Sequence, residues 1–168
     1  MMLVLIISAM LSSTVIAQSA PEIKGAFIYS FSKLVKWPDH VYTSQNASLT
    51  IGFIGETNVQ AYLTAATSGR LVNAQKIEVR RIDISDIDKC QIIFIADSSR
   101  IEEVIRQCDG KPILTMSDVK GFAARGGAVE YVEVNGKVRF HINWKAANQG
   151  GLISNAKLKT LARRVINQ

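Results

Sequence analysis

Histidine, cysteine and proline are scarce in this chain of 168 residues, which has two, two and three of them, respectively. Two histidines and two cysteines are too few to supply the closely spaced ligands of a zinc site. The cysteines do not form a Cys-x-x-Cys redox motif, and the chain has no Gly-x-Ser-x-Gly nucleophile elbow. The sequence therefore predicts no metal, no cofactor and no catalytic residues, so that the protein is not an enzyme.

Runs of like charge are absent as well. The net charge is +6, but no stretch contains five or more consecutive charges of one sign. Nucleic-acid-binding proteins combine a basic surface with a recognition motif, and no such motif is present. We therefore expect no nucleic-acid partner. The positive excess favours an acidic protein or an anionic membrane surface instead.

One long apolar stretch stands at the N-terminus, where Met1 to Ile16 carries no charged side chain. Its apolar run, Leu3 to Leu11, is shorter than the roughly 20 residues that cross a bilayer. This pattern is typical of a secretory signal peptide. We expect residues 1–17 to be cleaved after Ala17 and residues 18–168 to form one exported domain. An uncleaved anchor is the alternative, since no Lys or Arg precedes the apolar run.

The two cysteines, Cys90 and Cys108, bracket a predicted strand (92–96) and the helix that follows it (99–107). In a strand–helix unit the helix runs back along the strand, so both cysteines fall at the same end of the unit. An even cysteine count behind an export signal favours a disulfide. Its closure would stabilise the fold by about 3 kcal/mol. The alternative is a pair of buried, unpaired thiols.

Hydrophobic periodicity predicts an α/β fold. Strands alternate with amphipathic helices, an order typical of a mostly parallel sheet with helices on both faces. We therefore expect a single three-layer domain that ends in an antiparallel hairpin. The predicted helices span 22–36, 59–66, 99–107 and 154–167, and the predicted strands before the hairpin span 49–54, 76–82, 92–96 and 112–116.

The hairpin is the most precise of these predictions. Asn135-Gly136 is the preferred sequence of a type I′ turn, because both residues tolerate positive φ. Pairing around this turn places Tyr131 opposite Phe140 and Val129 opposite Ile142 on one face. On the other face it pairs Val132 with Arg139 and Glu130 with His141. We interpret Glu130 and His141 as a surface cross-strand pair rather than as a metal site.

A glycine-rich loop, 118–127, precedes the hairpin and is open to two interpretations. It contains Phe122 and Arg125, which would form a binding lip if Phe122 were exposed, and its backbone amides are suited to hold an anion. Alternatively, the glycines serve only to reverse the chain sharply before the hairpin. The sequence does not decide between the two.

Several motifs in matching order resemble the YfiR-like family of bacterial periplasmic proteins. They start at the first helix and its Trp37-Pro38 end, and they continue with the strand led by Cys90. The remaining motifs are Gly121-Phe122, Gly126-Gly127, 112–116, 139–143, 151–154 and Leu158. The resemblance implies a periplasmic regulator without catalytic activity. Such proteins restrain a diguanylate cyclase of the inner membrane by binding its periplasmic domain, which links envelope and redox state to cyclic di-GMP and biofilm formation.

From this resemblance we expect the hairpin and its preceding loop to contact the cyclase, or another membrane sensor. Aromatic and arginine side chains are the usual anchors of protein interfaces. The candidate contact residues are therefore Phe122, Arg125, Arg139 and Trp144. The oligomeric state stays open, a homodimer included. The alternative function is a periplasmic small-ligand-binding or accessory domain of an uptake or sensor-kinase system.

Overall fold

The computed structural model describes residues 18–42 and 47–167. The predicted signal peptide, with its cleavage position after Ala17, lies outside the described residues. The α-helices are α1 (Ala20–Leu34), α2 (Val59–Thr67), α3 (Ile101–Cys108) and α4 (Lys157–Leu161). Short 3-10 helices are η1 (Asp39–Val41), η2 (Ile84–Lys89), η3 (Ser98–Arg100), η4 (Ala123–Arg125) and η5 (Ala146–Gly151).

The described residues contain ten strands, which form two sheets. Their bounds are β1 (Val35–Lys36), β2 (Leu49–Ile54), β3 (Leu71–Val72), β4 (Gln75–Arg81), β5 (Ile92–Ile95), β6 (Leu114–Ser117), β7 (Val129–Val134), β8 (Lys137–Asn143), β9 (Ile153–Ser154) and β10 (Arg164–Ile166). The main sheet has the order β10-β8-β7-β6-β5-β2-β4-β3, and β1 pairs separately with β9. Its centre is parallel, whereas β7–β8 and β3–β4 are antiparallel hairpins. The predicted α/β class is confirmed.

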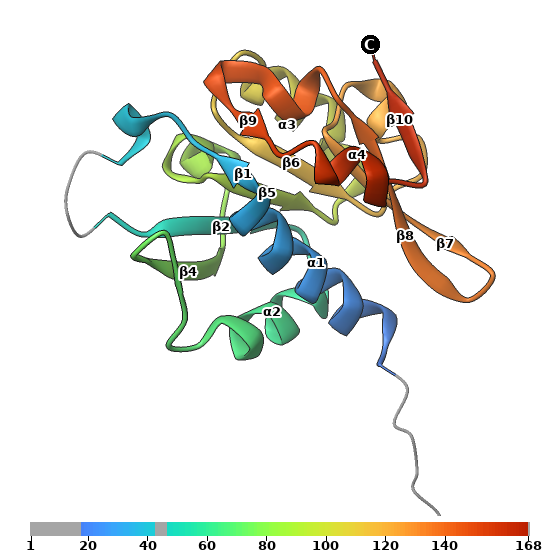
Figure 1. Ribbon diagram of the computed structural model, residues 1–168, viewed down its shortest axis with the longest axis horizontal. Helices are drawn as coiled ribbons and strands as arrows, with labels where there is room; N and C mark the ends of the chain where they lie inside the picture. Colours follow the sequence, from blue (N-terminus) through green and yellow to red (C-terminus); the bar gives the residue numbers. More distant parts are fainter. Residues whose placement is uncertain (1–17, 43–46, 168) are drawn as a thin grey trace, which may run out of the picture.

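Helices lie on both faces of the sheet, as predicted (Figure 1). Side chains alternate along each strand, so that Ile92 and Phe94 of β5 join one core while Ile93 and Ile95 join the other. The first core is covered by α1, α2 and Leu158 of α4. The second is smaller and is covered by α3 and η2. The result is the predicted three-layer arrangement.

The hairpin has the predicted register. Tyr131 pairs with Phe140, Val129 with Ile142, and Glu130 with His141. Asn135 and Gly136 adopt φ values of 50° and 69°, as a type I′ turn requires. The alternation of apolar and polar residues around one strong turn therefore specified the pairing.

The C-terminal segment differs from the prediction of one helix over 154–167. The helix α4 is short, and β10 follows it and pairs in parallel with β8. Two backbone bonds secure the new strand: Arg163 N donates to Phe140 O (2.8 Å), and Trp144 N donates to Ile166 O (2.7 Å). The apolar residues of this segment have helical spacing, but β-branched Val165 and Ile166 favour a strand. They pair with β8 and form the edge of the sheet.

No helix of the described segments has both the length and the apolar character needed to cross a bilayer.

Candidate partner-binding surface

The glycine-rich loop before β7 folds around a carboxylate of the chain itself. Glu130 is buried, and its two oxygens accept hydrogen bonds from Gly121 N (2.9 Å) and Ala123 N (3.1 Å). Backbone amides do hold an anion here, as one interpretation of the loop required, but that anion is Glu130. The predicted surface pair between Glu130 and His141 is therefore wrong in part: the register is right, but the carboxylate faces the loop.

Phe122 is fully buried, so the expectation of an exposed aromatic lip is wrong. Its ring packs in the second core with residues of α3 and β5. Gly127 gives the ring room, because a Cβ built there would lie 2.2 Å from Phe122 Cε1. This close approach explains a glycine at 127, and it shows that the loop is a sharp reversal with a structural role.

The other three candidates reach the surface in different places. Arg125 lies on η4, and its guanidinium forms an ion pair with Glu102 of α3 at 3.3 Å. Arg139 is exposed on β8. Trp144 is half-buried, with the Lys159 ammonium 4.1 Å from its ring centroid. The structure therefore does not gather the four predicted residues into one patch, and Phe122 cannot contact a partner.

Positive charge, in contrast, is concentrated in the last part of the chain. Residues 129–167 contain seven basic side chains and two acidic ones, and one of those acids is the buried Glu130. We call the seven exposed side chains the C-terminal basic surface: Lys137, Arg139, Lys145, Lys157, Lys159, Arg163 and Arg164. Within residues 18–42 and 47–167, none of them forms an ion pair with a carboxylate.

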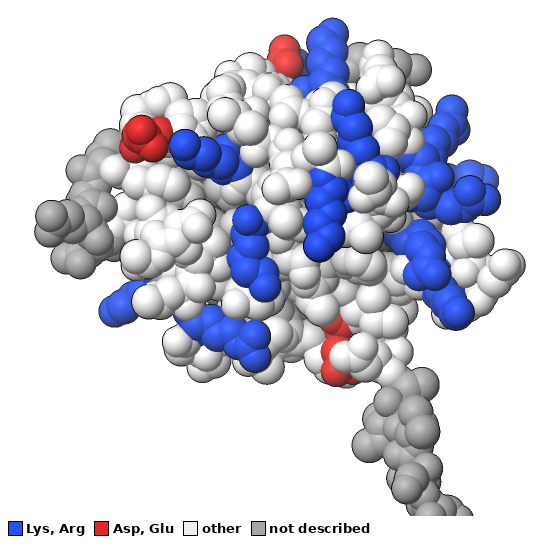
Figure 2. Space-filling model, viewed as in Figure 1, with Lys and Arg blue, Asp and Glu red and all other residues white. Residues whose placement is uncertain are grey.

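Figure 2 shows the face that carries α1 and α4, where Lys and Arg greatly outnumber Asp and Glu. Sequence reasoning missed this concentration because it searched for consecutive charges. The signal was present as a regional imbalance between the last 40 residues and the rest.

A shallow groove of about 520 Å³ borders Arg163 and Arg164 of the C-terminal basic surface, and its residues Val132, His141 and Arg164 lie on the sheet face opposite α1. It lies between the hairpin and β10, and its lining includes Val132, His141 and Arg164. His141 and Arg164 pair across β8 and β10, so their side chains lie on the same face of the sheet. The groove therefore offers apolar contact beside two groups that bind carboxylates.

Comparison with known protein families gives one match. The model of the family described as DUF4154, YfiR/HmsC-like, covers residues 21–163. The chain belongs to the YfiR/HmsC-like family. No curated protein matches the chain significantly. The family match includes the loop, the hairpin and α4 and ends just before β10.

In this YfiR/HmsC-like domain, Cys90 and Cys108 are both buried in the second core and are free thiols in the structure. Burial raises the pKa of Cys90 to about 11 and that of Cys108 to about 12. Each thiol is therefore protonated and poorly nucleophilic at neutral pH. Their shared core agrees with the predicted meeting of the strand start and the helix end, but the disulfide itself stays a prediction.

The two histidines of this YfiR/HmsC-like domain do not join other ligands. In the part of the chain that the structure describes, no three His, Cys, Asp or Glu side chains come together as a metal-binding group. His40 is exposed on η1 beside the start of β5, and His141 lies on β8 beside β10. The features that distinguish the surface are its charge and its groove.

Proposed function

We propose that this protein is a periplasmic regulator that restrains an inner-membrane diguanylate cyclase by binding the cyclase's periplasmic sensor domain. Membership of the YfiR/HmsC-like family supports a regulatory role. The charge of the C-terminal basic surface is the observation that supports a particular contact region. We propose that this surface, and not the loop around Phe122, contacts the partner.

The charge of this surface determines the kind of partner it fits. Residues 129–167 expose seven basic side chains and one acidic side chain, that of Glu133. Such an imbalance accelerates association with an acidic surface and disfavours basic ones. Arg139 and Trp144 retain a place in the proposal, because both belong to or border this surface. Arg125 is engaged with Glu102 and contributes less.

Binding is tested by mixing the purified protein with the periplasmic domain of the host's membrane diguanylate cyclase. The expected result is a complex whose association rate falls steeply as salt is raised, because screening weakens exposed charges. Replacing Arg139 and Arg164 by Glu should weaken the complex at least tenfold, an effect of the size expected for charges at an interface rim. Cyclic di-GMP in cells that carry this variant should rise.

Arg106→Glu is the matched control. Arg106 is exposed on α3, which packs over β5 and η2 and not over β8 or β10, and forms no ion pair within the described segments. This variant should bind like the unmodified protein. Equal binding by all three proteins would remove the C-terminal basic surface from the proposal, and no association at any salt concentration would remove the cyclase partner.

A second candidate, a small-ligand-binding domain, is supported by one groove. It measures about 560 Å³, lies beside the end of α1, and includes Trp37 and Tyr42 in its lining. This volume falls in the range of small-molecule sites. A thermal-shift screen distinguishes this function, since a ligand at 100 times its dissociation constant adds about 2.7 kcal/mol of stability.

A further inference from the structure

The groove beside the end of α1 brings together segments that are far apart in the sequence. It is lined by the last turn of α1, by β1 and by the turn between β3 and β4. The strand β9 joins this lining because it pairs with β1, with Lys36 opposite Ile153. The groove measures about 560 Å³ and is called the α1-end groove below. Its lining includes basic, amide and apolar side chains: Lys33, Lys36, Asn73, Gln75, Ile153 and Asn155.

The cations of the α1-end groove have no carboxylate partner. Lys33 and Lys36 are exposed, and neither forms an ion pair within the described segments. The Lys33 ammonium lies 4.1 Å from the centroid of the Tyr29 ring, so an aromatic face and not an acid holds it at the end of α1. Among the described residues that line the groove, Asp39 is the one acid. The groove therefore favours an anionic ligand.

Gln75 adds a buried polar atom that lacks a partner. Its Oε1 is buried and accepts no hydrogen bond from residues 18–42 and 47–167. Buried side-chain oxygens are nearly always hydrogen-bonded, because an unpaired one destabilises the fold. The terminal torsion of a glutamine is soft, so a small rotation of the amide turns this oxygen toward a ligand in the groove. The unpaired oxygen thus indicates a ligand that donates a hydrogen bond, as a hydroxyl group does.

Two asparagines increase the hydrogen-bonding capacity of the groove. Asn155 Oδ1 accepts from Lys157 N (2.9 Å), whereas its Nδ2 donates to no group of the described segments. Asn73 is exposed in the β3–β4 turn, where it adopts a φ of 51°. An amide offers donors and an acceptor side by side, and a hydroxyl group both donates and accepts. Amides from separate parts of the chain therefore suit a ligand with several hydroxyl groups.

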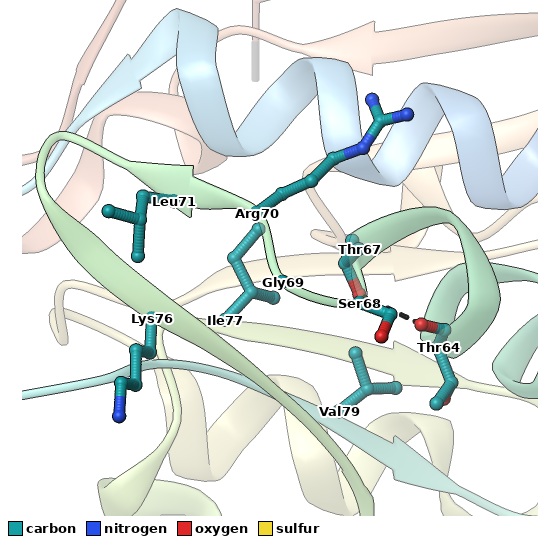
Figure 3. Close-up of a pocket in the computed structure, with 9 residues that line it drawn as sticks. All are labelled: Thr64, Thr67, Ser68, Gly69, Arg70, Leu71, Lys76, Ile77 and Val79. Carbon is teal, nitrogen blue, oxygen red and sulfur yellow. Dashed lines mark hydrogen bonds between the residues drawn. The ribbon is translucent and has the colours of Figure 1, made fainter.

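The neighbouring pocket along β4 has a different character (Figure 3). It measures about 290 Å³, and Leu71, Ile77 and Val79 provide its apolar lining. The α1-end groove, in contrast, has one strongly exposed apolar side chain, that of Ile153, at 63%. Trp37 also lines it, but its indole is 3% exposed and donates to Gln91 O (3.3 Å). A single apolar contact among polar groups suits the C–H face of a sugar ring better than a flat apolar ligand.

We propose that the α1-end groove binds an anionic carbohydrate, a sugar that carries a carboxylate or a phosphate group. Lys33 and Lys36 attract the anion, since ammonium groups act as point charges toward either kind. Gln75 Oε1 accepts a hydrogen bond from a hydroxyl group of the ring, and Asn155 Nδ2 donates to another. Ile153 covers one face of the ring. This ligand class rests on the second candidate function, that of a small-ligand-binding domain.

The site is separate from the proposed cyclase contact. None of the described residues that line the α1-end groove belongs to the C-terminal basic surface. Carbohydrate binding can therefore be measured without the cyclase, and the loss of either interaction leaves the other intact.

Isothermal titration calorimetry of the purified protein at low salt tests the ligand class. The probes are glucuronate, glucose 6-phosphate, glucose and inorganic phosphate. We expect at least one of the two anionic sugars to bind about tenfold more tightly than glucose, which lacks the group that the lysines attract. Inorganic phosphate should bind about tenfold more weakly than that sugar, because it makes no use of the amides. No binding of either anionic sugar, or equal affinity for glucose or for inorganic phosphate, would overturn the proposal.

Variants test whether the sugar occupies this groove. Gln75→Met removes the unpaired oxygen, so it should weaken sugar binding about tenfold and at the same time raise the urea midpoint of the free protein. Lys36→Gln should weaken binding and reduce its dependence on salt. Lys76→Gln is the matched control, because Lys76 is exposed, follows Gln75 in β4 and points away from the pocket of Figure 3. This variant makes the same charge change and should leave the Kd unchanged.

The comparison of the two lysine variants decides the location even if Gln75→Met does not fold, as circular dichroism would show. Equal Kd values for Lys36→Gln and Lys76→Gln, or an unchanged Kd in a folded Gln75→Met variant, would contradict binding in the α1-end groove. A ligand of another chemistry that binds in the thermal-shift screen, without any anionic sugar, would leave the second candidate function standing and remove this ligand class.

Discussion

Glu130 holds the loop before the hairpin by accepting hydrogen bonds from the backbone of Gly121 and Ala123, at 2.9 and 3.1 Å. The carboxylate is buried at the start of β7, between the sheet and η4. It replaces the water that the two N–H groups would otherwise bind. One side chain thus connects the glycine-rich loop to the strand that carries the proposed contact surface.

Glu130→Ala should destabilise the protein strongly. It leaves the buried N–H of Ala123 and the partly buried N–H of Gly121 without an acceptor, and the loss at a buried donor costs about 1–3 kcal/mol. Glu130→Gln retains one acceptor oxygen and should cost about half as much. Urea unfolding measures both. Glu133→Ala is the control, because Glu133 is exposed and should change the free energy of unfolding by less than about 0.5 kcal/mol.

Gly127→Ala should be destabilising for a steric reason alone. The backbone of Gly127 does not have a positive φ, but its Cβ would lie 2.2–2.4 Å from three atoms of the Phe122 ring. Overpacking of this kind costs about 1–3 kcal/mol. Thermal unfolding of the variant measures the loss.

A double variant separates this steric cause from a loss of backbone freedom. Phe122→Leu removes Cε1 and Cζ, the two ring atoms that the new methyl group would approach most closely, so Gly127→Ala should cost less when it is made in that background. An equal cost in both backgrounds would argue against the ring contact.

The hairpin could be predicted from the sequence because local and long-range signals agree there. Asn135-Gly136 specifies the turn, and the two-residue alternation on both sides specifies the faces. Glu130 could not be placed, since alternation assigns it to the polar face and says nothing of a loop that folds over it. Phe122 was misplaced for the same reason: a loop residue has no periodicity from which burial can be inferred.

The C-terminal strand shows a different limit. Leu158, Leu161 and Val165 have helical spacing, but Leu161 is 49% exposed and Val165 belongs to β10. An edge position beside β8 was available, and pairing with it outweighed a helix propensity that is weak for β-branched residues. Only knowledge of the sheet order reveals that edge. The positive charge of the same segment could have been predicted from the sequence, because basic residues greatly outnumber acidic ones there.

Ala74→Gly should stabilise the protein. Ala74 adopts a φ of 67° in the β3–β4 turn, a left-handed conformation that costs a residue with a Cβ about 1 kcal/mol. Glycine removes this strain, although it increases the entropy of the unfolded chain, so the net gain should be about 0.5 kcal/mol. Ala65→Gly in α2 is the matched control and should lose about 1 kcal/mol, since Ala65 is exposed and helical.

Reduction should destabilise the protein isolated from an oxidising compartment. If the predicted Cys90–Cys108 bond forms there, thiol titration in denaturant without reductant should find no free thiol. Breaking the bond should then lower the free energy of unfolding by about 3 kcal/mol. Two titratable thiols in the isolated protein would instead show that both cysteines stay reduced.

The reduced protein should lose further stability at high pH. Burial raises the pKa of Cys90 from its usual 9.0 to about 11 and that of Cys108 to about 12, so folding favours the protonated thiols. Their contribution is complete below pH 9 and declines as pH rises through the folded-state values, because the unfolded chain then releases protons that the folded chain retains. The oxidised protein has no thiol to titrate. Its urea midpoint should therefore fall less between pH 9 and 11 than that of the reduced protein, and a Cys90→Ala/Cys108→Ala variant should follow the shallower curve. Equal slopes for all three proteins would mean that the thiols are not buried as the structure places them.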